Sequence, residues 1–125
     1  MTPEYGHVYV ADLNPRFGTE PGKVRPVVVV QTDGLNRVHP STIVCPVTTR
    51  TAGFPNLLRV AVPKGVSGLA RASDILVDQV KAIDNRRLRR KLGSLPDPYL
   101  AELRRKLLLV LDFVEEASAA GDAGS

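Results

Sequence analysis

Short apolar runs rich in β-branched residues follow one another closely over the first two thirds of the chain. The clearest is a run of four valines at positions 27–30, directly after Arg25 and Pro26. A β-branched run this short, bounded by turn residues, is typical of a strand buried on both faces. It is too short and too β-rich to favour a helix. We therefore expect a core strand over residues 25–32, with Arg25 at its start.

Further strands are expected on both sides of this one. Apolar and polar residues alternate over residues 6–13 and 57–62, a pattern typical of half-buried strands. The apolar run at residues 41–47 predicts another strand. Two shorter strand pieces are expected at residues 68–73 and 74–81.

Turn residues separate these segments. Proline, glycine and asparagine mark residues 14–24 as a long loop. We expect this loop to be a flexible flap over a site. Shorter turns are expected at residues 33–36 and 63–65.

The pattern changes to helical after the last expected strand. The cation-rich residues 85–92 predict a short helix. Asp84 or Asn85 is its expected cap, and Gly93 its expected end.

A second, amphipathic helix is expected near the C-terminus. Asp97 is its predicted N-cap, with Pro98 in the first turn and Glu102 close to the start. Residues 104–106 are three cations that lie off its apolar stripe. The stripe recurs at intervals of three and four, and its members are Leu100, Leu103, Leu107, Val110, Leu111 and Val114.

Many short strands followed by one amphipathic helix argue for a mainly β fold. We expect a small twisted barrel or curled sheet packed by the C-terminal helix. The chain has 125 residues, enough for one domain with a real core and too few for two. We expect a single domain over residues 1–113 and a flexible tail, rich in Ala, Gly and Ser, over residues 114–125.

The charge of the chain favours a polyanionic partner. Its formal net charge is +4 and its pI is about 9.6. The tail carries three acidic residues and no Lys or Arg, so the rest of the chain carries +7. A small domain this basic suits a nucleic acid, although a solvated basic surface is the alternative.

The single cysteine, Cys45, lies in the apolar run of the third expected strand. It is expected to be a small core residue, which fits a reducing compartment. Neither a signal pattern nor an apolar run long enough to cross a bilayer occurs in the sequence. We therefore expect a cytoplasmic protein.

Several motifs occur in order along the chain. They are Gly6-His7-Val8-Tyr9-Val10-Ala11-Asp12-Leu13-Asn14-Pro15, Gly18-Thr19-Glu20, Gly22-Lys23-Val24-Arg25-Pro26 with the valine run, Pro46-Val47-Thr48-Thr49, Leu69 to Ser73, Asp78-Gln79-Val80-Lys81, Ile83-Asp84 and Arg87-Leu88. This ordered set resembles the MazF/PemK family of toxin endoribonucleases, over about residues 6–113. The chain departs from the family at His7, where an acidic residue is common.

The resemblance implies a fold and an activity. Members of the family are homodimers of a small barrel related to SH3 folds and to the gyrase-poison toxin CcdB. For this chain the resemblance implies six to seven strands and one or two helices. Family members cleave single-stranded RNA at short sequences without a metal or other cofactor, leaving a 2′,3′-cyclic phosphate and a 5′-hydroxyl. A cognate antitoxin with an acidic, disordered tail lies across the RNA groove.

The resemblance places catalytic positions at Arg25 and Thr48, with Thr49 as the neighbour. Such cleavage needs a base, charge stabilisation at the five-coordinate phosphorus and an acid. Arg25 suits charge stabilisation, because a guanidinium can hold two phosphoryl oxygens. Thr48 can donate to the phosphate or orient the 2′-hydroxyl. From the residues alone, Arg25 is equally an exposed arginine beside a strand, and Thr48 a strand-end cap.

The proton acceptor must be another residue, because arginine is effectively always protonated. Glu20, Asp78 and His7 are the candidates, and the sequence does not separate them. Each has a plain alternative: Glu20 as a solvated loop charge, Asp78 as a structural ion-pair partner and His7 as a strand-edge histidine. No cluster of His, Cys and carboxylates has metal-ligand spacing, which is consistent with metal-free cleavage.

RNA-binding residues are expected around these positions. Phe17 and Phe54 lie in loops where an aromatic ring can stack on a base, although each can equally plug the end of the barrel. The cations at residues 86–91 either follow the RNA or form the wet face of a helix. Further candidates for backbone or base contacts are Lys23, Thr49, Arg50, Ser73, Gln79 and Lys81.

Two other functions remain open from the sequence. A non-catalytic gyrase poison of the same fold has no need for Arg25 and Thr48 together. A plain RNA-binding module is suggested by charge alone, and it predicts salt-dependent binding without cleavage.

Overall fold

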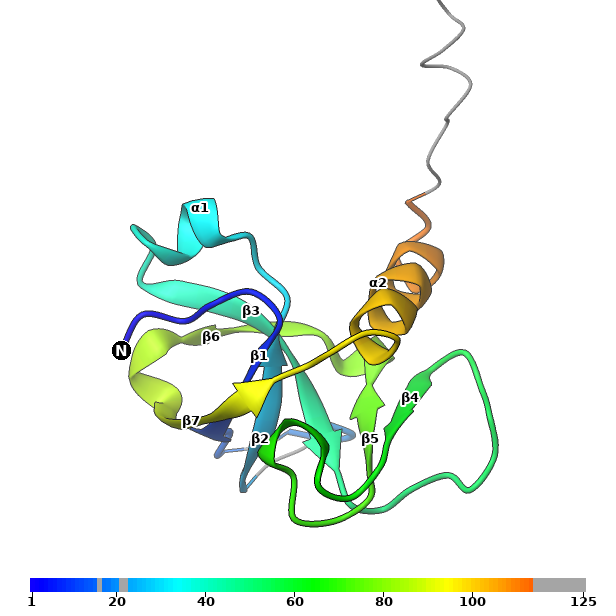
Figure 1. Cartoon of the computed structure of the whole chain (residues 1–125). Helices are drawn as coiled ribbons and strands as arrows, with labels where there is room; N and C mark the ends of the chain where they lie inside the picture. The colour runs from blue at the N-terminus through cyan, green and yellow to red at the C-terminus, as the bar shows by residue number, and fades with distance from the viewer. Residues whose placement is uncertain (16, 21–22, 114–125) are drawn as a thin grey trace, which may run out of the picture.

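A computed structural model describes residues 1–15, 17–20 and 23–113 of the chain. The chain forms a seven-stranded sheet. Figure 1 shows this sheet curled on itself, with the C-terminal helix packed against one side. The elements are β1 (His7–Asp12), β2 (Val24–Val29), α1 (Asp33–Asn36), β3 (Ser41–Thr48), β4 (Arg59–Val62), η1 (Val66–Gly68), β5 (Ser73–Leu76), η2 (Val77–Gln79), β6 (Lys81–Asp84), η3 (Asn85–Arg87), β7 (Leu88–Ser94) and α2 (Tyr99–Val110).

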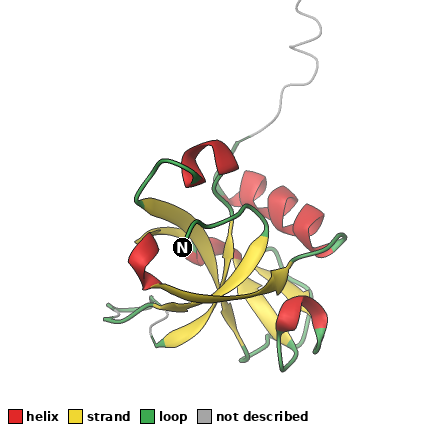
Figure 2. Cartoon of the chain, turned by 60° about the vertical axis from the view of Figure 1, so that its left-hand side comes forward, coloured by secondary structure: helices red, strands yellow, loops and turns green. Residues whose placement is uncertain are grey.

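The strands form one antiparallel sheet in the order β4-β5-β3-β2-β1-β7. β3 is long enough to change partners, since its first half pairs with β6 and its end pairs with β5. Figure 2 shows the resulting strong curl. The described strands leave β4 and β7 as the ends of an open order, so the mainly β fold with a C-terminal helix is confirmed, but the sheet is not a closed barrel.

The valine strand is buried on both faces, as its sequence predicts. Val28 belongs to a first core, which Cys45, Ile75 and Leu103 of α2 also enter. Val27 and Val29 belong to a second core on the other face. Side chains alternate along a strand, so β2 joins the two cores. The remaining members of the second core are Tyr9, Ala11, Leu13, Val44, Ile83 and Leu88.

Cys45 is fully buried, as expected. Burial raises the pKa of its thiol to about 12, with a smaller contribution from the negative charge of Asp78. A thiol with so high a pKa stays protonated at neutral pH and acts as a small apolar side chain.

The predicted helix over residues 85–92 is wrong. Only the turn η3 forms there, with Asp84 accepting from the Arg86 amide at 2.8 Å. The chain then continues as β7 and pairs with β1. Burial of Leu88 and pairing with β1 outweigh the local cap signals. Two register shifts in this pair let three successive cations stay exposed: Arg89, Arg90 and Lys91.

Smaller differences concern the turns. The turn expected at residues 33–36 is the helical turn α1. Residues 68–72 form no strand, and η2 interrupts the strand expected over residues 74–81. η2 interrupts the strand there because β3 changes partners between β5 and β6.

Helix α2 begins two residues later than its predicted cap, although Asp97 still accepts from the Ala101 amide at 3.1 Å. Leu103 is fully buried, as the apolar stripe predicts. The expectation that Lys106 lies off the buried face is wrong, because its ammonium bonds to the chain before β4. Val114 and the expected tail lie outside the described residues.

Gly68 explains how tightly η1 packs on β7. Its φ is +77°, and a Cβ there would lie 2.4 Å from the Leu92 carbonyl oxygen. Gly65 has a similar φ of +89°, but a Cβ there would meet open space. An alanine at either position would have a strained backbone, but only an alanine at Gly68 would also overlap with a neighbour.

We predict that Gly68→Ala destabilises the protein much more than Gly65→Ala. Positive φ costs an alanine about 1–2 kcal/mol at either position, and overpacking adds about 1–3 kcal/mol at Gly68. Urea unfolding of both variants measures the difference. Equal losses of unfolding free energy would contradict the close approach of η1 to β7.

Candidate active site

The pairing of β2 with β3 brings Arg25 and Thr48 to one end of the sheet. Val27 lies opposite Pro46 in this antiparallel pair. Continued by two residues, the same register sets Arg25 opposite Thr48. Residues opposite each other in an antiparallel pair point to the same face. Both side chains therefore lie at the outer edge of the second core, on a single face.

The same row continues across the next two strands. Thr48 is the register partner of Asp74 on β5, and Asp74 is the partner of Ala61 on β4. Asp74 is only 3% exposed. A carboxylate therefore lies buried next to the predicted catalytic threonine, and its role was not predicted from the sequence.

The hydroxyl of Thr48 has one defined partner. Its Oγ1 accepts from the Arg50 amide at 3.1 Å, and this bond closes a short turn at the end of β3. A threonine hydroxyl accepts and also donates. Its proton is thus available for a phosphate oxygen while the turn stays closed.

The chain between β3 and β4 carries several predicted RNA-binding residues. Thr49 and Arg50 are exposed directly beyond Thr48. Phe54 is 66% exposed and lines a pocket of about 520 Å³. The walls of this pocket include Phe54, Pro55, Arg59, Asp74, Tyr99 and Lys106.

The loop between β1 and β2 lies at the same end of the sheet as Arg25, since Ala11 is the register partner of Arg25. Phe17 is 71% exposed on this loop, Glu20 is half-buried and Lys23 is exposed. Its ends are tied, because the Lys23 amide donates to Asn14 Oδ1 at 2.8 Å and the Lys23 carbonyl accepts from Leu13 at 2.9 Å. Residues 16, 21 and 22 of the expected flap lie outside the described residues.

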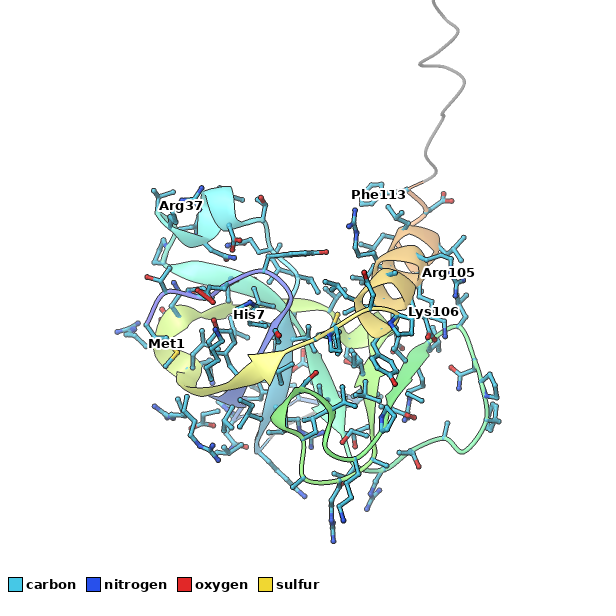
Figure 3. All side chains as sticks on the ribbon, viewed as in Figure 1. Met1, His7, Arg37, Arg105, Lys106 and Phe113 are labelled. Atoms are coloured by element: carbon cyan, nitrogen blue, oxygen red, sulfur yellow. The ribbon has the colours of Figure 1, made fainter. Side chains whose placement is uncertain are left out.

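Two of the three acid–base candidates lie away from this end. His7 begins β1 and is four residues from Ala11, about 13 Å along a strand. Its Nδ1 is 2.7 Å from Glu4 Oε2, and Figure 3 shows it on the N-terminal side of the molecule. Asp78 is exposed in η2. η2 connects β5, which pairs with the end of β3, to β6, which pairs with the start of β3. Only Glu20 belongs to a loop that ends beside Arg25.

Of the remaining predicted contacts, Ser73 precedes Asp74 at the end of β3, whereas Gln79 and Lys81 lie further back along β3. Lys81 is opposite Val44, on the same face as Thr48 but four residues back. Gln79 is half-buried in η2. Ser73 is buried, and its hydroxyl donates to the Arg71 carbonyl at 2.8 Å.

The comparisons with known proteins identify the family. The model of the PemK-like, MazF-like toxins of type II toxin–antitoxin systems matches residues 4–111. The chain belongs to this family. The resemblance expected from its ordered motifs is therefore confirmed.

Individual relatives agree with this assignment. The chain is 36% identical over 102 residues to Endoribonuclease MazF of Staphylococcus saprophyticus, covering 82% of this chain and 85% of the relative. It resembles the crystal structure of MazF from Deinococcus radiodurans, with a TM-score of 0.78, 31% identity and coverage of 90% and 99% of the two chains. A structure of MazE–MazF from the same organism gives a TM-score of 0.73, 31% identity and coverage of 91% and 99%.

The described residues contain neither a candidate metal site nor a candidate membrane-spanning helix. Over residues 1–15, 17–20 and 23–113, no three side chains of His, Cys, Asp or Glu come together in a way that could hold a metal ion. Within the same residues, no helix is long and apolar enough to cross a membrane. Metal independence stays a prediction of the family resemblance.

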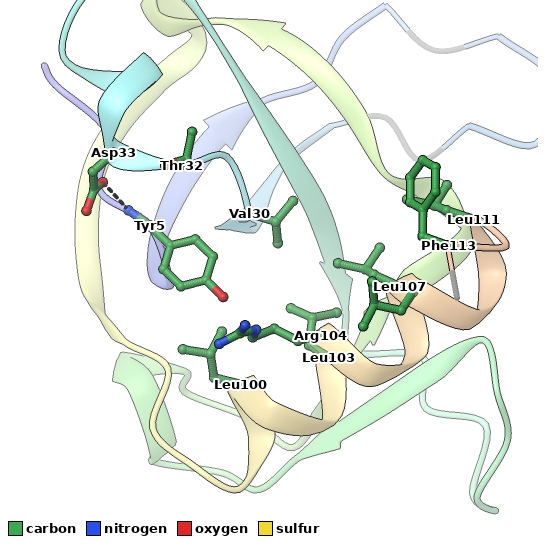
Figure 4. Close-up of a pocket in the computed structure, with 11 residues that line it drawn as sticks. Tyr5, Val30, Thr32, Asp33, Leu100, Leu103, Arg104, Leu107, Leu111 and Phe113 are labelled. Atoms are coloured by element: carbon green, nitrogen blue, oxygen red, sulfur yellow. Dashed lines mark hydrogen bonds between the residues drawn. The ribbon is translucent and has the colours of Figure 1, made fainter. Parts of the chain in front are cut away.

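A second pocket, of about 600 Å³, lies between α2 and the segment around Tyr5. Figure 4 shows Val30 and Leu107 on its walls, with the Tyr5 amide bonded to Asp33 Oδ1 at 2.8 Å. The last turn of α2 and the residues after it leave large apolar side chains exposed beside the pocket. These are Leu108, Leu111 and Phe113.

The cation-rich segment formed by η3 and the start of β7 is bonded to the base of the β1–β2 loop. Arg87 Nη1 donates to the Asp12 carbonyl at 2.9 Å and also to the Asn14 carbonyl. Arg89 pairs with the Asp12 carboxylate at 3.3 Å. The Asp12 carboxylate accepts a hydrogen bond from the Asn14 amide, and this bond is the main reason why the pKa of Asp12 is lowered. The Arg89 guanidinium lowers it further. Part of the cation cluster at residues 86–91 thus anchors this loop.

We predict that Arg87→Met lowers the free energy of unfolding by about 1.5–3 kcal/mol, because hydrogen bonds from a charged donor are lost. The matched variant Arg90→Met, at an exposed position on the strand β7 that follows η3, is expected to change it by less than about 0.5 kcal/mol. Urea unfolding measures both. If the two variants lose the same stability, Arg87 does not anchor the loop.

Proposed function

We propose that this chain is the toxin of a type II toxin–antitoxin pair and acts as a sequence-specific, metal-independent endoribonuclease on single-stranded RNA. The products are a 2′,3′-cyclic phosphate and a 5′-hydroxyl. The observation that carries the proposal is the β2–β3 register, which sets Arg25 and Thr48 on one face at one end of the sheet. The 36% identity to an Endoribonuclease MazF supports the same reaction class.

The chemistry assigns a role to each of these two residues. The 2′-hydroxyl loses its proton to a base and attacks the adjacent phosphorus, the bond from phosphorus to the 5′-oxygen breaks, and the departing 5′-oxygen takes up a proton from an acid or from water. Arg25 holds two phosphoryl oxygens and stabilises the extra negative charge that develops on them. Thr48 donates a hydrogen bond from its hydroxyl group to the same phosphate. DNA lacks the 2′-hydroxyl and is therefore not cleaved.

Glu20 is the proposed proton acceptor. It is half-buried in the loop that ends beside Arg25, whereas His7 lies at the opposite end of β1 and Asp78 lies beside the middle of β3. A carboxylate can accept the 2′-hydroxyl proton as that oxygen attacks. Arg25 itself keeps its protons and serves only the phosphate.

RNA binding extends from the catalytic end along one face. Phe17 and Phe54 are both well exposed on the flanking loops, which supports stacking on unpaired bases. Cations and polar groups near the end of β3 and along it are proposed to contact the RNA backbone and bases. These are Lys23, Thr49, Arg50, Ser73, Gln79 and Lys81.

The proposed partners are a second copy and an antitoxin with an acidic, disordered tail. The chain without its last twelve residues carries a net +7, which suits both an acidic peptide and RNA. A solved MazE–MazF complex among the similar structures supports the antitoxin. The exposed leucines of α2 support burial of this helix in a homodimer. The proposed location is the cytoplasm.

We predict that the purified protein cleaves a short mixed-sequence RNA in EDTA and that Arg25→Ala slows cleavage by at least about 100-fold, because transition-state charge is left unstabilised. Mass analysis of the fragments identifies the cyclic-phosphate ends and the cleavage sequence. Arg37→Ala is the matched control, since Arg37 is exposed near His7 at the other end of the sheet.

Intact RNA with the wild-type protein, in a sample free of antitoxin, would contradict the proposed activity. Salt-dependent RNA binding without cleavage would then indicate a binding module. Inhibition of DNA supercoiling would instead indicate a gyrase poison.

A further inference from the structure

We infer that Arg59 and Asp74 are positioning residues, which together hold the turn that carries Thr48 and Arg50 in its active conformation. Neither residue was predicted from the sequence, and neither is expected to touch the RNA. The inference rests on the proposed function for its catalytic consequence. Its structural part, the clamp on residues 48–52, is independent of that function.

The clamp consists of one carboxylate oxygen and one guanidinium nitrogen. Asp74 Oδ2 accepts from the Ala52 amide at 2.8 Å and from Arg59 Nη1 at 3.0 Å. The same Nη1 donates to the Arg50 carbonyl at 2.9 Å. The pair therefore holds one backbone acceptor and one backbone donor of the turn simultaneously.

Thr48 is connected to the same clamp. Its Oγ1 accepts from the Arg50 amide at 3.1 Å, while Arg59 holds the Arg50 carbonyl. The peptide groups on both sides of Arg50 are thus fixed. Because Thr48 is the register partner of Asp74, the β3–β5 pair fixes the distance between the hydroxyl and the clamp.

The clamp is itself anchored to α2. Lys106 is only 8% exposed, and its Nζ donates to the Arg59 carbonyl at 2.7 Å and to the Asn56 carbonyl at 2.9 Å. The third bond of this ammonium goes to Glu102 at 2.7 Å. All three donors of the lysine are used. Figure 3 shows Lys106 on the side of α2 that faces β4.

Burial makes this pair sensitive to substitution. The side chain of Asp74 is 4% exposed and that of Arg59 is 29% exposed. Removing one partner leaves a buried charge without compensation, so the turn must rearrange. A displacement of about 1 Å in a group that contacts the reacting phosphate can slow turnover by about 100-fold. Ground-state binding of RNA through the flanking loops is affected much less.

We predict that Asp74→Asn lowers kcat for RNA cleavage by about 10- to 100-fold while KM changes by less than about threefold. The same variant is expected to speed hydrogen exchange at the Ala52 amide, measured by NMR without RNA, while the Val28 amide in the core stays protected. Asp84→Asn is the matched control, because it removes the exposed Asp84–Arg86 pair at 3.0 Å and leaves the turn untouched. The control is expected to change neither quantity.

Arg59→Lys tests the same inference if Asp74→Asn fails to fold. It keeps the positive charge but removes the guanidinium nitrogen that joins the Arg50 carbonyl to Asp74. A fall in kcat and faster exchange at Ala52 are again expected.

Three outcomes would overturn the inference: wild-type turnover in the variants, unchanged exchange at Ala52, or a change confined to KM, which would make the pair an RNA contact. A wild-type protein that cleaves no RNA would refute the proposed function. The exchange measurement would then still decide whether the clamp exists.

Discussion

The antiparallel pairing of β2 with β3 is the constraint on which the rest of the structure depends. The valines of β2 are buried on both faces, so this strand cannot shift by one residue without exchanging its two sets of core side chains. The register that this burial specifies also decides which residues meet at the end of the pair. Continued by two residues beyond the Val27–Pro46 pair, this register sets Arg25 opposite Thr48 at that end.

Around this pair, polar groups connect elements that are distant in sequence. The end of β3 is tied to β4 and β5 through Arg59 and Asp74, and β4 is tied to α2 through Lys106. On the other side, Arg87 of η3 ties the base of the β1–β2 loop. The two loops that flank Arg25 are thus each anchored by a buried or half-buried cation. Such anchoring limits the motion of the loop residues that are proposed to contact the RNA.

The sequence predicted those parts of the protein that local pattern decides. The valine run predicted a strand buried on both faces, and the ordered motifs indicated the family. The assignment of Arg25 and Thr48 as catalytic residues stays a prediction. The helix expected over residues 85–92 failed because pairing with β1 and burial of Leu88 outweighed the cap signals. Lys106 and Asp74 were missed for a related reason. A charged residue inside an apolar pattern shows its partners only when strands and helix are placed in space.

The central claim is that Arg25 and Thr48 act together on one phosphate. A double-mutant cycle on kcat with Arg25→Ala, Thr48→Val and the double variant tests it most directly. Residues that act as a unit are strongly non-additive, so the account predicts a double variant within about threefold of the slower single variant. Losses that multiply fully would contradict it, because the two side chains would then act independently.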